Sequence, residues 1–293
     1  MESPSAAPVP APPALELAGV GKHFEPAGKG GERVTAIEEV SLRVPQAPQG
    51  RFVVLLGPSG CGKSTILFML AGLLSADAGE VSTFGRPVSG PNPDTALVFQ
   101  QYACFPWRTA LGNVAFALEI RDRVSPIHRL TGLVIRSAAA EARQKRALEY
   151  LRMVGLDDRP GAYPRELSGG MQQRVAIART LAAQPRIILM DEPFGALDAQ
   201  TRQGMQQMLL RVWDDVNCTV VFVTHDITEA ILLADEIVVL SARPAHIVEH
   251  LQVPFPRPRD LVLVQDPRFS DLQGHLLRLL KGAPNVGELS VTL

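Results

Sequence analysis

One nine-residue segment, GPSGCGKST at 57–65, restricts the possible folds more than any other feature of the chain. It matches the pattern G-x-x-x-x-G-K-[ST], directly after the apolar run FVVLL and directly before ILFMLAGLL, which is typical of a helix. Glycines permit a tight loop whose backbone N–H groups point inward, and the following helix adds its positive N-terminal end. The sequence therefore predicts a strand, loop and helix that bind a polyphosphate mainly through the main chain.

Two side chains of this loop have predicted chemical roles. We expect Lys63 to reach the outer phosphates and the Ser64 hydroxyl to bind Mg²⁺. Cys61 lies near a helix N-terminus, which can lower a thiol pKa, although a small loop residue without chemistry is the plainer interpretation. The other residues that we predict to contact the nucleotide are Gly57, Pro58, Ser59, Gly60, Gly62 and Thr65.

The rest of the chain alternates short β-branched runs with longer segments of helical spacing. The runs are RFVVLLG, TALVFQ, RIILMD, TVVFVTHD and EIVVLSA. This alternation predicts an α/β fold with a mainly parallel, buried sheet. LELAGVGKHF and VTAIEEVSLRV, joined by the Gly-rich loop EPAGKGGER, predict a small antiparallel β layer.

Residues from about 105 to 167 lack such runs and predict a helical subdomain. LGNVAFALEI and AAAEARQKRALEYLRMVGL are its helices, and Ala147, Leu148, Leu151 and Val154 share a face of the second. The segment 123–140 between them has no clear period. We expect residues 1–13 to be a disordered lead-in rather than a secretory signal, because Glu2 and several prolines stand in it. Residues 246–293 are predicted to form a C-terminal extension with one amphipathic helix that begins near Asp266 or Pro267.

Charge and composition exclude several classes of protein. Lys plus Arg is 29 and Asp plus Glu is 30, so no overall positive field favours sequence-general nucleic-acid binding. Three widely spaced cysteines fit neither a disulfide framework nor paired metal ligands, which favours a reducing, cytosolic setting. No apolar run approaches the ~18 residues of a membrane span.

Polar residues follow three of the predicted strands. RIILMDEP ends in adjacent carboxylates, and we assign Asp191 to the metal and Glu192 to the attacking water. His225 follows TVVFVT and Gln100 ends TALVFQ. Because sites gather at the carboxyl ends of parallel strands, we expect His225 to contact the γ-phosphate and Gln100 to bind Mg²⁺ or water. A lone histidine is more often structural, so the role expected of His225 depends on its place at the same sheet edge as the other polar groups.

With LSGGMQQR at 167–174, the chain resembles the nucleotide-binding subunit of ATP-binding-cassette (ABC) transporters. The motifs GPSGCGKST, VFQ, LSGGMQQR, ILMDEP, GALD and THD occur in the family's order, and the resemblance covers about residues 14–245. It implies an ATPase domain over that range, with a phosphate-loop NTPase (RecA-like) core. It also implies a homodimer that holds two ATP molecules head to tail.

In such a dimer, Ser168, Gly169 and Gly170 would contact the γ-phosphate held by the partner subunit's Lys63, and Asp198 would lie at the seam. Ser168 is a good N-cap at the start of the helix MQQRVAIARTLAA, although a capped amphipathic helix alone would also explain these residues.

Phe24 matches the family position that stacks an aromatic ring on adenine, with plain core packing as the alternative.

Two further stretches, YACFPWRTALGNVAFAL and EIVVLSARPAHIVEH, are similar to importer subunits of the nitrate, sulfonate, taurine and bicarbonate group, except that Ala245 and His246 stand where Gly and Arg are usual. The resemblance implies ATP hydrolysis with Mg²⁺, coupled to solute uptake through a separate membrane permease. It also implies an extracytoplasmic solute-binding protein and a peripheral location on the cytoplasmic face of the cell (inner) membrane.

The alternative is a soluble ABC ATPase that acts on nucleic acid or the ribosome. Against it, the interval from Gln100 to Ser168 holds no sustained heptad, and the chain has one cassette. Export instead of import also stays open.

Overall fold

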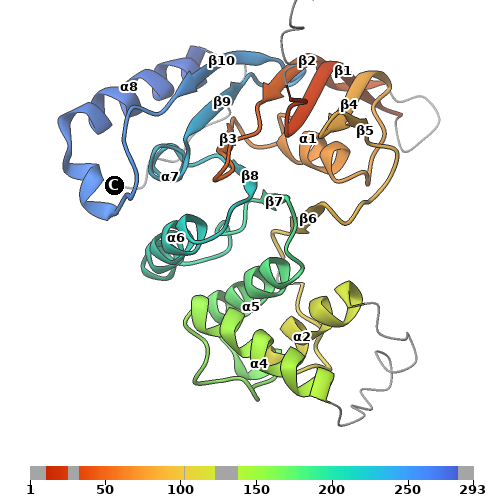
Figure 1. Ribbon diagram of the computed structural model, residues 1–293. Coiled ribbons are helices and arrows are strands. Elements are labelled where there is room, and N and C mark those ends of the chain that lie inside the picture. The colour runs from red at the N-terminus through yellow and green to blue at the C-terminus, as the bar shows by residue number, and fades with distance from the viewer. Residues whose placement is uncertain (1–10, 26–32, 102, 123–137, 283–293) are drawn as a thin grey trace, which may run out of the picture.

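The computed structural model describes residues 11–25, 33–101, 103–122 and 138–282, and in them the strands form two sheets. Figure 1 shows both sheets in an upper lobe, while α2, α4 and α5 form a lower lobe beneath them. The α-helices are α1 (Lys63–Leu70), α2 (Ala110–Arg121), α4 (Ala138–Met153), α5 (Gly169–Ala182), α6 (Ala199–Asp214), α7 (Ile227–Leu233) and α8 (Pro267–Gly282).

The larger sheet has the strand order β10-β9-β3-β8-β7-β6, in which β9, β3, β8, β7 and β6 run parallel. Its strands are β3 (Phe52–Leu56), β6 (Thr95–Val98), β7 (Ile187–Asp191), β8 (Thr219–Thr224), β9 (Glu236–Leu240) and β10 (Ile247–Gln252). Every residue of β3, β7, β8 and β9 is buried, as expected for strands covered on both faces. The predicted parallel, buried sheet is confirmed.

The smaller sheet is antiparallel and has the order β2-β1-β4-β5. Its strands are β1 (Leu15–Phe24), β2 (Val34–Val44), β4 (Ala78–Thr83) and β5 (Arg86–Pro87). The predicted antiparallel layer is therefore present, although most of the loop expected between its first two strands lies outside the described residues.

Alternation along β3 places two hydrophobic cores on opposite faces of the larger sheet. Phe52, Val54 and Leu56 join the core that contains the helices of both lobes, including α5 to α8. Val53 and Leu55 join the core beneath α1 and the smaller sheet. The sheet is thus covered on both faces, and its carboxyl edge is left for polar groups.

The lower lobe contains the predicted helical pair. Ala147, Leu151 and Val154 are buried on one face of α4 and just beyond its end, as their spacing indicated. The predicted irregular segment 123–140 lies outside the described residues except at its end, and so do residues 1–10 of the predicted lead-in. The domain boundaries stay a prediction.

The C-terminal part contains a strand that the sequence analysis did not predict. β10 pairs with β9 antiparallel, and its residues alternate between half-buried and exposed. The chain continues through the 3₁₀ helix η2 (Leu261–Gln265) to α8, which begins at Pro267 as expected.

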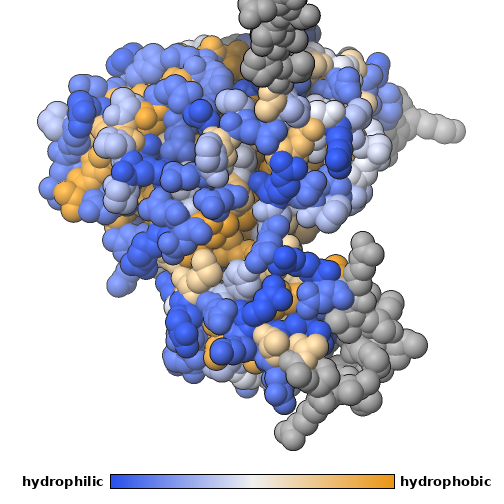
Figure 2. All heavy atoms as spheres, viewed as in Figure 1, coloured by the Kyte–Doolittle hydropathy of each residue, from blue (hydrophilic) through white to orange (hydrophobic). Residues whose placement is uncertain are grey.

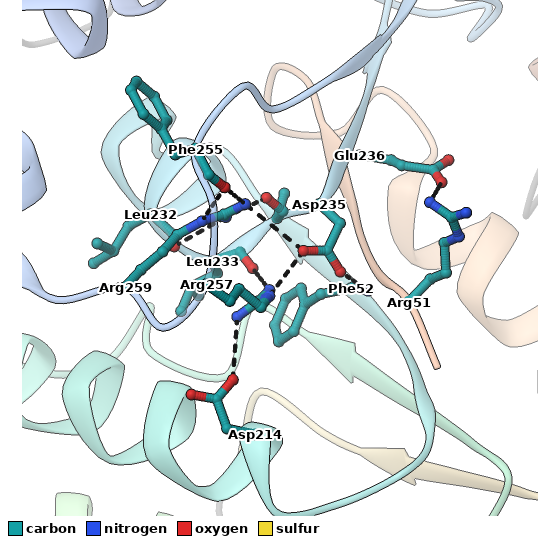
Figure 3. A network of polar contacts seen from close by, with 11 residues as sticks. Arg51, Phe52, Asp214, Leu232, Leu233, Asp235, Glu236, Phe255, Arg257 and Arg259 are labelled. Atoms are coloured by element: carbon teal, nitrogen blue, oxygen red, sulfur yellow. Dashed lines mark hydrogen bonds and ion pairs between the residues drawn. The ribbon is translucent and has the colours of Figure 1, made fainter. Parts of the chain in front are cut away.

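Two arginines fix this C-terminal part to α7 (Figure 3). Arg257 donates to the carbonyl of Leu233 at 2.6 Å and to Asp235 at 2.8 Å. Buried Arg259 donates to the carbonyls of Leu232 and Ala234. These guanidinium groups satisfy carbonyls that the end of a helix leaves without partners.

The face of the molecule in Figure 2 is largely hydrophilic, and apolar residues gather between the two lobes, beside α6. None of the helices in the described part of the chain combines the length and apolar character that crossing a bilayer requires.

Candidate nucleotide site

The loop after β3 has the backbone conformation that a phosphate cradle needs. Gly60 and Gly62 have φ angles of 75° and 120°, which favour glycine. Lys63, the first residue of α1, is buried and turns its ammonium group back onto the loop, donating to the carbonyls of Gly57 (2.8 Å) and Pro58 (2.9 Å). Its charge is therefore held at the mouth of the loop.

The sequence analysis did not identify Arg243 as part of this loop. Its guanidinium donates to the carbonyl of Gly60 at 2.8 Å. Arg243 follows β9, the strand beside β3, so the sheet order brings it to the loop from 183 positions away. No spacing rule along the sequence could have indicated the contact.

Asp191 at the end of β7 is joined directly to the loop. The Ser64 hydroxyl donates to its Oδ1 at 2.7 Å. Burial raises the pKa of Asp191, and the negative charge of Glu192 adds to that effect, while the Ser64 hydrogen bond opposes it. A positive ion at this point would stabilise the buried carboxylate.

Glu192 has a strained backbone with φ of +41°, in the left-handed region that glutamate rarely adopts. Its N–H donates to the carbonyl of Val223 on β8, and its carbonyl accepts from Gly195, each at 3.1 Å. Strained residues of this kind cluster at functional sites, and the surrounding bonds hold this one in place.

The side chain of Glu192 lies between the ammonium group of Lys63 and the imidazole of His225. Its Oε1 is 3.7 Å from the ammonium of Lys63, and its Oε2 is 3.3 Å from Nδ1 of His225. The hydrogen bond with His225 lowers the pKa of Glu192 despite partial burial, and the same bond raises the pKa of His225. His225 directly follows β8, so the predicted edge of the sheet brings both groups together.

Gln100 lies near this cluster but not at a strand end. β6 stops at Val98, two residues earlier than predicted. A Cβ added at Gly195 would lie 3.5 Å from Nε2 of Gln100 and 3.7 Å from Oε2 of Glu192, so both groups approach Gly195. Gln100 and Asp191 also line one open hollow, together with Phe99, Gln101 and Ala103.

The LSGG residues lie in the other lobe, apart from α1 (Figure 1). Ser168 is the N-cap of α5, and its hydroxyl accepts from the N–H of Met171 at 3.3 Å. Gly169 begins the helix, and Gly170 lies so close to Thr201 that an added Cβ would be 2.5 Å from its methyl group. Asp198 caps α6 on the surface, and both of its carboxylate oxygens accept from Thr201.

Phe24 ends β1 and is 41% exposed, so plain core packing does not describe it. The Lys22 ammonium lies 5.9 Å from its ring centroid and is held by Asp77 at 2.8 Å. Asp77 also accepts from the N–H of His23 at 2.7 Å, which fixes the strand just before Phe24.

Cys61 departs from one expectation. Burial raises the pKa of its thiol, and this outweighs the opposing effect of Lys63. The interpretation as a small loop residue without chemistry agrees with this environment better than that of an activated thiol.

The oxygen atoms of Ser64 and Asp191 fit Mg²⁺, which prefers hard oxygen ligands and usually keeps water and substrate phosphates as the others. Among the residues described, no group of three His, Cys, Asp or Glu side chains could hold a metal ion by itself. This donor set suits an ion that arrives with a nucleotide.

A phosphate loop after one strand, with acidic side chains at the end of a strand two places along the same parallel sheet, defines a phosphate-loop NTPase. The ABC transporter family profile matches residues 38–195. The chain belongs to this family and is an ATP hydrolase of the ABC type.

Two of the relatives are transport subunits whose names state their solutes. The chain is 43% identical over 250 residues to the bicarbonate transport ATP-binding protein CmpD of Synechocystis sp., covering 84% of this chain and 82% of CmpD. It is 42% identical to the nitrate import ATP-binding protein NrtC of Synechococcus elongatus, over 86% of this chain and 36% of NrtC.

A solved dimeric structure of the ATP-binding cassette MJ0796, in a post-hydrolysis state bound to ADP and Pi, is 32% identical. Its TM-score is 0.64, and the match covers 83% of this chain and all of that one. These findings confirm the predicted resemblance and fold class.

Proposed function

We propose that this chain is the ATPase subunit of an importer, and that it energises uptake of a small anionic solute such as nitrate, sulfonate, taurine or bicarbonate through a separate membrane permease. The observation that carries the proposal is a cluster of polar side chains at the carboxyl edge of the larger sheet, which is separated from Ser168 in the other lobe. The cluster consists of Lys63, Ser64, Asp191, Glu192 and His225.

Hydrolysis at this edge requires an oriented water molecule and stabilisation of the developing charge. Glu192 orients the water and accepts its proton, because its lowered pKa keeps it ionised at neutral pH. Lys63 and His225 contact the γ-phosphate, and the loop from Gly57 to Thr65 binds the phosphates. Ser64, Asp191 and Gln100 hold Mg²⁺, which supplies charge neutralisation when bound.

The nucleotide needs a second copy of the chain. Ser168, Gly169 and Gly170 stand at the N-terminus of a 14-residue helix, a site suited to phosphate. We propose a head-to-tail homodimer in which this helix end faces the γ-phosphate on the partner subunit, with Asp198 at the seam and Phe24 stacked on adenine.

The region after Gln100 supplies a surface for the permease. Trp107 is 70% exposed and lies beside Phe105, and exposed apolar surface of this kind marks sites of protein–protein contact. We propose that closure of the dimer moves this region against the permease at the cytoplasmic face of the cell membrane, with a solute-binding protein on the outer side. The similarity to CmpD, a bicarbonate transport protein, and NrtC, a nitrate import protein, supports this group of solutes.

The Glu192→Gln variant tests the ATPase part of this proposal. We expect it to bind ATP, to lose at least about 100-fold in turnover and to accumulate as an ATP-bound dimer in light scattering. Glu249 on β10 offers a matched control, because it forms a similar pair with His275 (3.0 Å) and β10 is an edge strand that lies four places from β7 in the sheet. Glu249→Gln should keep wild-type turnover, and wild-type turnover in Glu192→Gln would remove Glu192 from its role.

Transport is tested with the permease present. The full chain, purified from membranes with its associated proteins, should bring down a polypeptide with several spanning helices. Reconstituted vesicles should then take up nitrate, sulfonate, taurine or bicarbonate when ATP and the cognate binding protein are supplied. Uptake of none of them would reject the solute group but leave the ATPase assignment.

A further inference from the structure

Three buried polar side chains from three different elements meet directly behind His225. They are Thr224 at the end of β8, Gln206 on α6 and Glu229 on α7. The Thr224 hydroxyl donates to Oε2 of Glu229 at 2.7 Å, and the Gln206 amide donates to Oε1 at 3.1 Å. Both carboxylate oxygens therefore have partners.

The same side chains fix the backbone on both sides of His225. The N–H of Asp226 donates to the Thr224 hydroxyl oxygen at 3.0 Å. The N–H of Glu229 donates in turn to Oδ1 of Asp226 at 3.1 Å. A closed ring of hydrogen bonds thus runs through Thr224, Asp226 and Glu229, and His225 lies within the turn that this ring encloses.

The side chain of His225 is held less firmly than its backbone. It is 49% exposed, and its polar partner among the described residues is Oε2 of Glu192 at 3.3 Å. The orientation of the imidazole therefore depends on its backbone. Buried hydrogen bonds are costly to break, so a ring closed by Glu229 is a rigid support for that backbone.

We propose that Glu229 is a positioning residue for ATP hydrolysis, which holds His225 at the γ-phosphate through the hydroxyl of Thr224. This inference rests on the role proposed for His225. Glu229 does not touch the nucleotide in this arrangement. It also connects His225 to α6, whose N-cap Asp198 lies two helical turns before Gln206.

Two pairs of substitutions separate positioning from simple stability, using the full chain. Thr224→Val keeps the side-chain shape and removes the hydroxyl, while Thr224→Ser keeps the hydroxyl. Glu229→Leu removes both acceptors, while Glu229→Gln keeps one oxygen for Thr224. Thr224→Val and Glu229→Leu should lower kcat about 10- to 100-fold, because small misplacements of a catalytic group have effects of that size. Thr224→Ser and Glu229→Gln should restore most of it.

The KM for ATP should stay within about twofold of wild type, because the lost interaction acts in the transition state. Glu236 provides the control for loss of a buried carboxylate. It is paired with Arg51 (2.9 Å) and His250 (2.9 Å) at the opposite end of the sheet's strands. Glu236→Leu should lower the unfolding temperature and leave kcat unchanged.

A double-substitution cycle with His225→Ala separates failure of this inference from failure of the role proposed for His225. Thr224→Val should cost nothing further in a His225→Ala background, because residues that act as one unit are not additive. If His225→Ala loses turnover and Thr224→Val does not, the inference is overturned and the role of His225 stands. If His225→Ala retains full turnover, the proposed role of His225 fails, and the inference fails with it.

Discussion

The hydroxyl of Ser64 donates to Oδ1 of Asp191 at 2.7 Å, across 127 positions of the sequence. This bond joins the first turn of α1 to the end of β7. Two oxygen atoms suited to Mg²⁺ are therefore adjacent, although they come from widely separated parts of the sequence.

Removing the hydroxyl of Ser64 should change the Mg²⁺ requirement of hydrolysis more than it changes nucleotide binding. Ser64→Ala should lower the ATP hydrolysis rate at least about 100-fold and raise the Mg²⁺ concentration for half-maximal rate. Binding of ATP without Mg²⁺ should stay close to wild type. Ser82→Ala on β4, away from the loop, is the control. An unchanged Mg²⁺ dependence in Ser64→Ala would contradict the assignment.

The bond between His225 and Glu192 should appear in the titration of the imidazole. The raised pKa of His225 means that the stabilisation from this pair is complete below the free imidazole value of about 6.5 and is lost as pH rises through the folded value. The lowered pKa of Glu192 means that the stabilisation is present above about pH 4.3, the value of a free glutamate, and is lost as pH falls through the lower folded value. The pair thus stabilises most between about pH 4.3 and 6.5.

Because His225 is half exposed, this contribution is below about 1 kcal/mol and is better measured by NMR titration than by unfolding. Glu192→Gln should lower the pKa of His225 towards the free value. Glu249→Gln should leave it unchanged. A His225 titration that is identical in wild type and Glu192→Gln would show that the pair does not form in solution.

Phe24 should contribute to base binding through its ring. Phe24→Ala is expected to raise the KM for ATP about tenfold, because stacking of a base on an aromatic ring contributes about 1–3 kcal/mol. Phe24→Trp should keep the affinity. Val34 pairs with Phe24 on β2 and is also exposed, so Val34→Ala is a control for the local surface. If Phe24→Ala and the wild type bind ATP with equal affinity, Phe24 has a structural role and does not contact the base.

The sequence predicted the elements whose signals are local. β1 and β2 agree with their runs, because alternating apolar residues and flanking Gly and Pro mark both ends. β6 ended early, since it is the edge strand and its ladder with β7 stops at Val98 and Met190. β10 was missed because a short alternating pattern between Arg and Pro residues is a weak strand signal, and its partner β9 supplies the pairing.

Site residues were predictable as types but not as contacts. The motifs indicated Asp191, Glu192 and His225, yet their separations follow from the register of β7 on β8, which pairs Asp191 with Val223. The positive φ of Glu192 and the contact of Arg243 with the loop depend on neighbouring strands, so no local pattern encodes them.

The arginines of the C-terminal part should matter for stability. Arg259→Met leaves the carbonyls of Leu232, Ala234 and Phe255 without their charged donor in a buried place, which should lower the free energy of unfolding by about 2–4 kcal/mol. Burial lowers the pKa of Arg259 to about 10, so the guanidinium still carries its charge at neutral pH and donates to these carbonyls as a cation. Urea unfolding measures the change.

An exposed arginine on α8 is the control for that experiment. Arg268 pairs with Asp266 at the surface, and Arg268→Met should change the free energy of unfolding by less than about 1 kcal/mol. Equal losses in both variants would mean that the buried carbonyls find other partners when Arg259 is removed.

The division of the nucleotide site between two copies can be tested by mixing inactive chains. Lys63→Ala and Ser168→Arg each damage one half of the proposed site and should each be inactive as homodimers. When they are mixed and allowed to exchange, a mixed dimer carries one site with both defects and one site with none. The mixture should therefore hydrolyse ATP faster than the sum of its components, up to about a quarter of the wild-type rate if the sites act independently.

The matched control mixes Lys63→Ala with Glu192→Gln. Both changes lie in the same half of the site, within 3.7 Å of each other in one chain, so every site in a mixed dimer keeps one defect. No recovery is expected there. Recovery in both mixtures would point to exchange artefacts, while failure of the Ser168→Arg mixture, once exchange is verified by differently tagged chains, would place the whole nucleotide site within a single copy.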